Sequence, residues 1–561
     1  MGDSKYVFDA IVVGSGISGG WAAKELCEKG LRTLVVERGR NVEHIRDYPT
    51  APLNPWDFDH RLNNTLREKE KDPIKTAYGD AASNLFFVND SEHPYLQEKP
   101  FTWVRGYQVG GRSLTWGRQC YRLSDLDFEA NARDGVGVDW PIRYKDLAPW
   151  YDHVETYVGI SGQKENCPVL PDGVFLPPME MNCVESHFSQ EVRAHYSDRL
   201  VTIARTANLT QGWNGRGPCQ YRNLCARGCP FSGYFSSNAA TLPSAAATGN
   251  LTLMSDSIVE EVLFDDSTSR ANGIRVLNAH TRAVTEYRAK IIFLNASTID
   301  TAALLLRSVS RRFPEGLGNS SGQVGHNLMD HFVGTGADAD FDGFMDEYYS
   351  GRRPVGIYIP RFRNLTDGSQ RKDYLRGYGL QGKGGRAEWR EQSGKLSGFG
   401  KGFKEQLLKP GPWGLWLGGW GETLPNYANR IALDRERKDP WGLPLVSIHF
   451  EYGPNEEAMS KDIRASIEEM LGVAGFKNIR SYSRLMPGGT AVHEMGTVRM
   501  GRDPRTSVLN GNNQLHDVPN VFITDGSCMT SSGSANPSLT YMALTARACD
   551  FAVNELKKGR L

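Results

Sequence analysis

The 561-residue sequence contains no hydrophobic run long enough to cross a bilayer. Its most apolar region, residues 413–420, is short and rich in glycine, whereas a membrane-spanning helix needs about 20 apolar residues. The charged segment and hydrophobic stretch of a secretory signal peptide are also missing, because residues 1–5 lead directly into an apolar strand. We therefore expect no direct membrane insertion and, by sequence, a cytoplasmic location.

The sequence also lacks net charge. Lys and Arg number 65 and Asp and Glu number 65, so the formal charge is zero, and no dense basic run occurs. Proteins that bind nucleic acid usually carry a basic patch, so we expect no nucleic-acid partner. The hydrophobic fraction of 39% is typical of a globular protein, and the length exceeds what one compact core organises.

The number of cysteines is odd, so they cannot form a fully paired set of disulfides. There are nine: six are scattered along the chain, and three cluster at Cys219, Cys225 and Cys229. A reducing folding compartment is the simplest interpretation.

The first forty residues predict a βαβ unit. Residues 8–13 form an apolar run, residues 14–20 are rich in glycine, residues 21–28 suit a helix, and residues 31–37 form a second apolar strand. Such a unit implies a parallel sheet.

The turn of this unit has the Gly-x-Gly-x-x-Gly spacing at Gly14, Gly16 and Gly19, and Glu37 closes the second strand. These glycines allow a tight turn and close approach of a pyrophosphate to the helix N-terminus, and an acid at that distance accepts from ribose hydroxyls. A Gly-rich turn can also simply join a strand to a helix, and the pattern does not separate FAD from NAD. The residues predicted to bind the dinucleotide here are Gly14, Gly16, Ile17, Ser18, Gly19, Glu37 and Arg38.

Three later segments favour FAD. They are Val-Gly-Gly-Arg-Ser-Leu-Thr-Trp-Gly at 109–117, His-Glu-Met-Gly-Thr-Val-Arg-Met-Gly at 493–501, and Val-Phe-Ile-Thr-Asp-Gly-Ser at 521–527, with Asn536-Pro537 just beyond. In this order the chain resembles the glucose–methanol–choline (GMC) oxidoreductases, and within them the bacterial flavin subunits of gluconate, fructose, glucose and glucoside 3-dehydrogenases. The resemblance is weak over residues 340–480. It implies an enzyme that binds FAD and oxidises a CH–OH group.

The resemblance extends the predicted FAD site. Some relatives attach FAD covalently through a His at the position of Thr115, so we expect non-covalent FAD here. Asn536 and Pro537 suit the N-cap and first position of a helix whose positive end would face the flavin. The further residues predicted to bind FAD are Gly110, Gly111, Ser113, Leu114, Thr115, Asp525, Gly526, Asn536, Pro537 and Ser538.

His493 and Asn536 are the predicted catalytic residues. A neutral imidazole suits removal of a hydroxyl proton while hydride leaves for flavin N5, and Asn536 would hold the same hydroxyl. The two match the His/Asn version of the catalytic pair in the family. His326 and His331, in another segment that resembles the family, are interpreted as structural.

The cysteine cluster, with its Cys-x5-Cys-x3-Cys spacing, resembles the three-iron site of a bacterial glucose dehydrogenase flavin subunit. Cys219, Cys225 and Cys229 are therefore candidate ligands of a [3Fe–4S] cluster that would relay electrons singly. Zinc usually takes four ligands, and no fourth is obvious nearby. The alternative is a structural loop without iron.

The predicted fold class is α/β: a Rossmann-like FAD-binding domain built from discontinuous segments, with an inserted substrate domain on an antiparallel sheet, as in the GMC fold. Residues 291–295 and 519–525 have the pattern of buried strands, and residues 298–306 and 537–556 that of helices. The predicted FAD-binding segments are 1–160 (with a lid-like excursion at 41–105), 213–335 and 486–561, and the predicted substrate segments are 161–212 and 336–485.

The predicted activity is an FAD-dependent dehydrogenase that oxidises a sugar or glycoside hydroxyl, with C3 of a glucoside as the preferred position because of the overall resemblance. Trp413, Trp416 and Trp420 could stack on a sugar or belong to the core. Relatives pair with a small subunit and a cytochrome c acceptor, and such a subunit can carry an export signal, which would place the pair in the periplasm. The alternatives are an oxidase that uses oxygen, a non-catalytic flavin electron-transfer subunit and an NAD-dependent enzyme.

Overall fold

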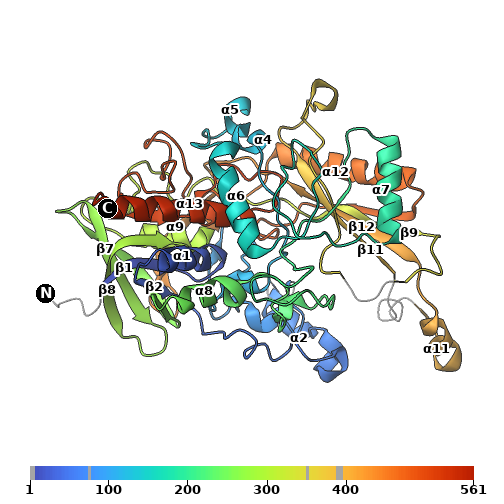
Figure 1. Ribbon diagram of the computed structural model, residues 1–561, viewed down its shortest axis with the longest axis horizontal. Helices are drawn as coiled ribbons and strands as arrows, with labels where there is room; N and C mark the ends of the chain where they lie inside the picture. The colour runs from blue at the N-terminus through green and yellow to red at the C-terminus, as the bar shows by residue number, and fades with distance from the viewer. Residues whose placement is uncertain (1–6, 74–77, 349–352, 387–395) are drawn as a thin grey trace.

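The computed structural model describes residues 7–73, 78–348, 353–386 and 396–561. The start of the chain, on which the signal-peptide prediction rests, lies outside these ranges. A nucleotide-type sheet and an antiparallel sheet lie at opposite ends of the molecule (Figure 1). No helix in the described ranges is long and apolar enough to span a membrane.

The first sheet is mainly parallel and has seven strands. β1 pairs in parallel with β2 and β8, β2 with β5, and β16 with β8, whereas β6 and β7 add an antiparallel edge. In spatial order the strands are β5 (Leu251–Met254), β2 (Thr33–Val36), β1 (Val7–Val13), β8 (Val284–Leu294), β7 (Arg270–Asn278) and β6 (Ser257–Asp265), with β16 (Val521–Ile523) against the end of β8.

Both faces of this sheet are covered, which explains its continuous apolar strands. Ala10 and Val12 of β1 pack in one cluster with α1 (Ile17–Glu28) and α13 (Ser538–Lys557). Ile11 and Val13 point to the opposite face, in a cluster that includes α9 (Thr298–Arg307). The ends of β1, β8 and β16 therefore meet at one edge, where Gly14, Asn295 and Asp525 follow their strands.

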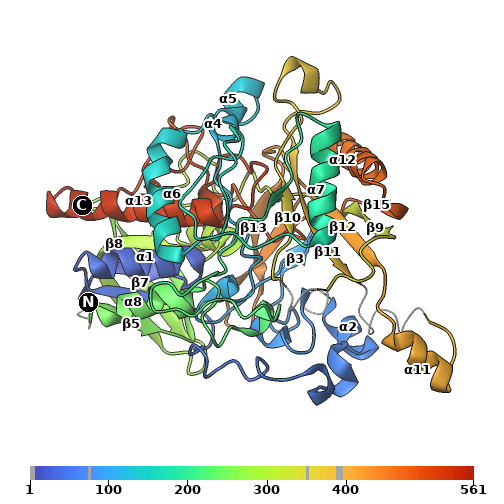
Figure 2. The same cartoon turned by 45° about the vertical axis from the view of Figure 1, so that its right-hand side comes forward.

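The second sheet is antiparallel and has six strands. In order they are β15 (Lys477–Ser483), β9 (Thr335–Phe341), β12 (Trp413–Gly421), β11 (Tyr378–Arg386), β10 (Ile357–Ile359) and β4 (Thr202–Ile203). The helices α7 (Cys183–His195) and α12 (Pro454–Val473) cover its outer face (Figure 2).

Alternation along β11 and β12 separates the core of this sheet from its inner face. Leu380, Leu415 and Leu417 are buried among the side chains of α7 and α12. Because neighbouring strand residues point to opposite faces, Gln381 and Trp416 point the other way. They face the half of the molecule that contains the mainly parallel sheet (the nucleotide half).

The remaining elements connect the two sheets. A small sheet contains β13 (Arg430–Lys438), β14 (Pro444–His449) and β3 (Leu96–Gln97). The predicted excursion at 41–105 contains α2 (Leu66–Lys71), short 3₁₀ turns and β3. The helices α6 (Tyr144–Val158) and α8 (Leu242–Ala247) lie beside the nucleotide sheet, and α4 (Asp125–Phe128) and α5 (Ala130–Asp134) lie between the two sheets. The helix α11 (Gly400–Leu408) projects from the far end (Figure 1).

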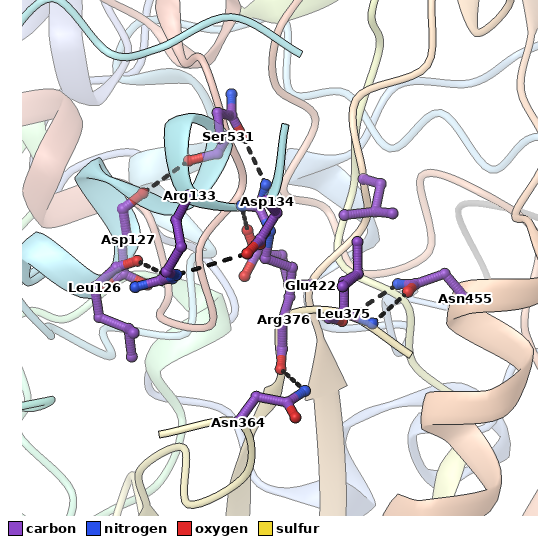
Figure 3. Close-up of polar contacts among 12 residues, drawn as sticks. Leu126, Asp127, Arg133, Asp134, Asn364, Leu375, Arg376, Glu422, Asn455 and Ser531 are labelled. Carbon is purple, nitrogen blue, oxygen red and sulfur yellow. Dashed lines mark hydrogen bonds and ion pairs between the residues drawn. The ribbon is translucent and has the colours of Figure 1, made fainter. Parts of the chain in front are cut away.

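A buried arginine joins the two halves (Figure 3). Arg376, just before β11, is fully buried; it contacts Asp134 of α5 at 2.5 Å and Glu422 after β12 at 3.1 Å. It also donates to Asn131 Oδ1 at 2.8 Å. The Asn131 amide in turn donates to the carbonyl of Thr530 at 3.0 Å, in the loop that leads to Asn536. The ion pairs of Arg376 therefore support the C-terminal loop from the half of the molecule that contains the antiparallel sheet and the predicted segment 336–485 (the substrate half).

Candidate active site

A cavity of about 570 Å³ runs between the two halves. One end is lined by the Gly-rich turn and Glu37, and the other by His493, Asn536 and the inner face of β11 and β12. The predicted excursion contributes Tyr78, Trp103 and Arg105 to its wall. One continuous space thus joins the predicted adenosine end to the predicted catalytic pair.

Most of the predicted cofactor residues line this cavity. They are Gly14, Gly16, Ile17, Ser18, Glu37, Arg38, Gly111, Ser113, Thr115, Asp525, Gly526, Asn536, Pro537 and Ser538. The other three predicted residues, Gly19, Gly110 and Leu114, lie behind it. A Cβ on Gly19 would meet the carbonyl oxygen of Gly14 at 1.9 Å, and Leu114 is fully buried.

The Gly-rich turn has the backbone that its spacing predicts. Gly14 has φ +90°, and a Cβ there would lie 2.4 Å from the carbonyl oxygen of Asn295. A Cβ on Gly16 would meet nothing within 4 Å, although Gly16 lines the cavity. The open side of Gly16 is therefore the place where a phosphate can approach the backbone.

Glu37 is held at the end of β2 by hydrogen bonds. Its carboxylate accepts from the Ser15 hydroxyl at 2.6 Å, the Ser15 N–H at 3.1 Å and the Gly39 N–H at 3.0 Å. Burial raises the pKa of this carboxyl despite these bonds. The position suits an acceptor for ribose hydroxyls.

Six side chains that line the cavity each have a buried polar atom without a hydrogen-bond partner among the described residues: Ser18, Arg38, Arg105, Arg118, Asn295 and Tyr541. Two of these atoms are the Asn295 side-chain Nδ2 and the Tyr541 hydroxyl. Buried polar groups are normally satisfied, so these two atoms indicate a polar ligand that the protein chain does not supply. Together with the open side of Gly16, they fit FAD.

The N-terminus of α13 faces the same cavity. The sequence predicts Asn536 at the N-cap and Pro537 as the first helical residue; the structure places Pro537 at the N-cap and Ser538 first, one residue later. Such one-residue shifts are normal at helix ends. The free N–H groups and positive dipole end of the helix suit the stabilisation of negative charge.

Asp525 lies two residues after β16 and lines the cavity, and its side chain also makes hydrogen bonds that stabilise the local fold. It accepts from the Thr301 hydroxyl at 2.6 Å and from the Ser527 N–H at 3.0 Å. Burial raises the pKa of this carboxyl.

His493 lies on a segment that a buried carboxyl fixes. Asp330 accepts from the His493 N–H at 3.0 Å and from the Ala491 N–H at 3.2 Å. Burial, reinforced by the charge of Glu494, raises the pKa of Asp330 to about 8. Glu494 itself pairs with Arg112, whose Nη2 lies 2.7 Å from its carboxylate.

The two ring nitrogens of His493 contact two residues that the sequence analysis names, Asn536 and His331. Its Nε2 lies 3.3 Å from Asn536 Nδ2, as the predicted catalytic pair requires. Its Nδ1 lies 2.9 Å from Nδ1 of His331. His331 was interpreted from the sequence as structural, and its place beside His493 was missed. His326, five residues earlier, is stacked on Tyr427 instead, with ring centres 3.8 Å apart.

One carbonyl fixes the tautomers of both rings. His331 Nε2 lies 2.8 Å from the carbonyl oxygen of Gly533, which can only accept, so Nε2 carries the proton. Burial lowers the pKa of His331 to about 4 and holds the pKa of His493 well below its usual range, so both rings are neutral at pH 7. His331 Nδ1 must then accept the proton of His493 Nδ1. His493 Nε2 is left as a lone pair facing the cavity, which is the form a base requires.

The iron–sulfur prediction is not supported. Among the residues that the structure describes, no three His, Cys, Asp or Glu side chains form a group that could hold a metal ion. The sulfur atoms have protein neighbours: the Tyr221 N–H donates to Cys219 Sγ at 3.4 Å and the Gly233 N–H to Cys229 Sγ at 3.3 Å, and the Asn208 amide lies 4.0 Å from Cys225 Sγ. All nine cysteines are unpaired thiols. The spacing of Cys219, Cys225 and Cys229 therefore predicted a site that their arrangement does not form.

The fold and the cavity define a nucleotide-cofactor oxidoreductase, in which a Gly-rich βαβ turn and a buried imidazole share one space. Family models described as GMC oxidoreductase match residues 8–333 and residues 425–545. The chain belongs to the GMC oxidoreductase family. It is thus a flavoprotein enzyme that oxidises hydroxyl groups of alcohols or sugars, as the sequence predicts.

Individual relatives resemble the chain over nearly its whole length. It is 29% identical to the 2-methyl-1,2-propanediol dehydrogenase of Mycolicibacterium austroafricanum, over 97% of this chain and 94% of that protein. It is 26% identical to the fructose dehydrogenase large subunit of Gluconobacter japonicus, over 98% of each. The solved pyridoxine 4-oxidase from Mesorbium loti has the same fold, with a TM-score of 0.59, 16% identity and coverage of 97% and 98% of the two chains.

Proposed function

We propose that the protein is an FAD-dependent dehydrogenase that oxidises a ring hydroxyl of a sugar or glycoside, at C3 of a glucoside, with His493 as the base. The observation that carries the proposal is the position of His493 Nε2, which lies 3.3 Å from the Asn536 amide nitrogen in the cavity that contains the Gly-rich turn. Bound FAD supplies the hydride acceptor.

The chain itself supplies orientation and proton transfer. The Asn536 amide donates to the substrate oxygen, and that hydroxyl gives its proton to His493 Nε2 as the C–H bond breaks. The positive end of α13 lines the same cavity and would stabilise negative charge that develops on a bound flavin. Asp330 holds the His493 backbone, so the imidazole does not need to be ordered at the moment of reaction.

The inner face of the antiparallel sheet supports a sugar as substrate. Trp416 and Trp420 line the cavity with their rings perpendicular, 6.1 Å between centres. Aromatic faces and a few polar groups are the usual lining of a sugar site, and Lys383 provides a polar group on the same wall. Trp413 packs instead in the hydrophobic core. The fructose dehydrogenase relative also favours a sugar.

A cytochrome c or another one-electron acceptor, with a small partner subunit, is the proposed route for electrons. The relative named as a large subunit supports a partner. The proposed location is the cytoplasm, or the periplasm if the partner carries an export signal.

The proposal is tested by anaerobic flavin bleaching with a panel of glucosides and free sugars. We expect bleaching with glucosides, a 3-keto product, and turnover with a dye but not with oxygen. The His493→Ala variant should keep its flavin spectrum and lose at least about a thousandfold in reduction rate. Unchanged bleaching in that variant would refute the proposed base, and turnover with oxygen would favour the oxidase alternative. His326→Ala is the matched control.

A further inference from the structure

The Asn536 side chain receives a hydrogen bond from the antiparallel sheet. Gln381, on the inner face of β11, donates from Nε2 to Asn536 Oδ1 at 2.8 Å. It lies opposite Gly418 of β12, which has no side chain to fill the adjacent space. Gln381 is 9% exposed and lines the cavity.

A series of hydrogen bonds supports the side chain of Gln381. Gln119 Nε2 donates to Gln381 Oε1 at 3.2 Å, and the Tyr121 hydroxyl donates to Gln119 Oε1 at 2.5 Å. Tyr121 is fully buried, and its ring is stacked on Tyr358 with 3.8 Å between centres. The series of hydrogen bonds therefore begins at the stacked ring of Tyr121 and ends at the side-chain amide of Asn536.

The direction of every bond in this series follows from the tautomer of His493. Because His493 Nε2 bears a lone pair, Asn536 must turn its NH₂ group toward the ring. Its carbonyl oxygen then faces Gln381, which must present a donor, and the carbonyl of Gln381 faces the NH₂ group of Gln119. A donor at position 381 is thus what keeps the Asn536 amide in the orientation that the reaction uses.

We propose that Gln381 is a positioning residue for substrate oxidation, which acts through Asn536 and holds its NH₂ group toward His493 and the substrate oxygen. This inference rests on the proposed function. It assigns to the substrate half an indirect part in proton transfer, because a residue of β11 sets the orientation of a residue at the start of α13.

Two substitutions of similar size separate this role from a merely structural one. Gln381→Glu places an acceptor against Asn536 Oδ1, so the amide should flip and turn its carbonyl toward His493 Nε2, where it favours the protonated ring. Gln381→Met removes the donor without imposing the flip. Gln370→Glu, an exposed site in the same half, is the control for added charge.

The readouts are the limiting rate of anaerobic flavin reduction, substrate affinity, flavin content and the pH profile. We expect the limiting rate to fall about a hundredfold in Gln381→Glu and about tenfold in Gln381→Met. Only Gln381→Glu should move the acid limb of the profile to higher pH. Flavin content should be unchanged in both variants.

Equal losses in the two variants with an unmoved acid limb would overturn the inference, and so would wild-type behaviour of Gln381→Glu. His493→Ala keeps the two proposals distinguishable. If it is inactive while Gln381→Glu behaves like wild type, only the role of Gln381 fails. If it reduces flavin normally, the proposed function fails first.

Discussion

At the residue scale, His331 and His493 share one hydrogen bond between their Nδ1 atoms. The tautomer of His493 therefore depends on a residue 162 positions away in the sequence. Neither the position nor the contact of His331 follows from local sequence, because the two residues lie in separate loops with no shared periodicity. The His-Glu-Met-Gly motif and Asn536 could be singled out from sequence because the family resemblance carries them. The same resemblance draws attention to the segment of His331, but it does not predict the contact between His331 and His493.

Loss of His331 should impair the reaction without loss of the cofactor. In His331→Ala, His493 Nδ1 has no fixed acceptor, so the ring can rotate or take the other tautomer. We expect reduction of the flavin to slow by about ten- to a hundredfold, the range for loss of a residue that orients a functional His. Stopped-flow reduction measures this rate. An equal effect in His326→Ala, whose ring is stacked on Tyr427, would contradict the specific role.

The pH dependence should reveal the lowered pKa of His493. A His whose pKa is held below 6.5 by burial keeps its basic form at lower pH, so activity should stay constant from pH 8 down through 6.5 and fall only in more acidic buffer. The pH profile of kcat/KM measures the pKa in the free enzyme. An acid limb with its midpoint at or above 6.5 would show that this imidazole is not the group that titrates.

At the element scale, the β1–α1 turn matches its sequence pattern closely, because glycine positions leave few backbone alternatives. The helix was predicted from residue 21 and begins at Ile17, inside the motif. The predicted helix 298–306 falls within α9, and the predicted strand 291–295 overlaps β8 as far as Leu294 and runs one residue past its end. The inner face of β11 could not be identified, because strand register depends on partners such as β12 that are distant in sequence.

Two glycines of the turn should respond differently to a methyl group. In Gly19→Ala, the Cβ would meet the Gly14 carbonyl, so the FAD-free protein should lose about 2 kcal/mol of stability. In Gly16→Ala, the Cβ meets no protein atom within 4 Å, so the FAD-free melting temperature should stay unchanged while FAD affinity falls at least about tenfold. Thermal melts and FAD titrations measure both; normal FAD binding by Gly16→Ala would place the phosphates elsewhere.

At the scale of the whole molecule, the two halves are joined by buried charge as well as by apolar packing. Arg376 of the substrate half lies between Asp134 and Glu422 (Figure 3), and it also donates to Asn131 Oδ1. Removal of the arginine from a buried ion pair leaves the carboxylates buried without a positive charge beside them. Such a loss lowers the free energy of unfolding by about 3–5 kcal/mol. The predicted domain boundaries place Asp134 and Arg376 in different domains, so under that prediction the cluster would lie where the two domains meet.

Arg376→Met should therefore destabilise the protein by about 3–5 kcal/mol in chemical denaturation. Arg464→Met, which removes an exposed pair with Glu468 on α12, should cost no more than about 1 kcal/mol. Similar losses in the two variants would mean that water or rearrangement compensates the buried carboxylates.

The alternation of β11 and β12 has a consequence for how new specificities can arise. Positions 383, 416 and 420 face the cavity, while their strand neighbours Leu415 and Leu417 lie in the packed interior. Under the proposed function, mutations at these cavity-facing positions should change the accepted substrate and leave the packed leucines and the imidazole pair in place. Gln381 faces the cavity from the same side of the sheet, but substitution there should slow substrate oxidation. A directed-evolution library should therefore vary positions 383, 416 and 420 and keep Gln381 unchanged.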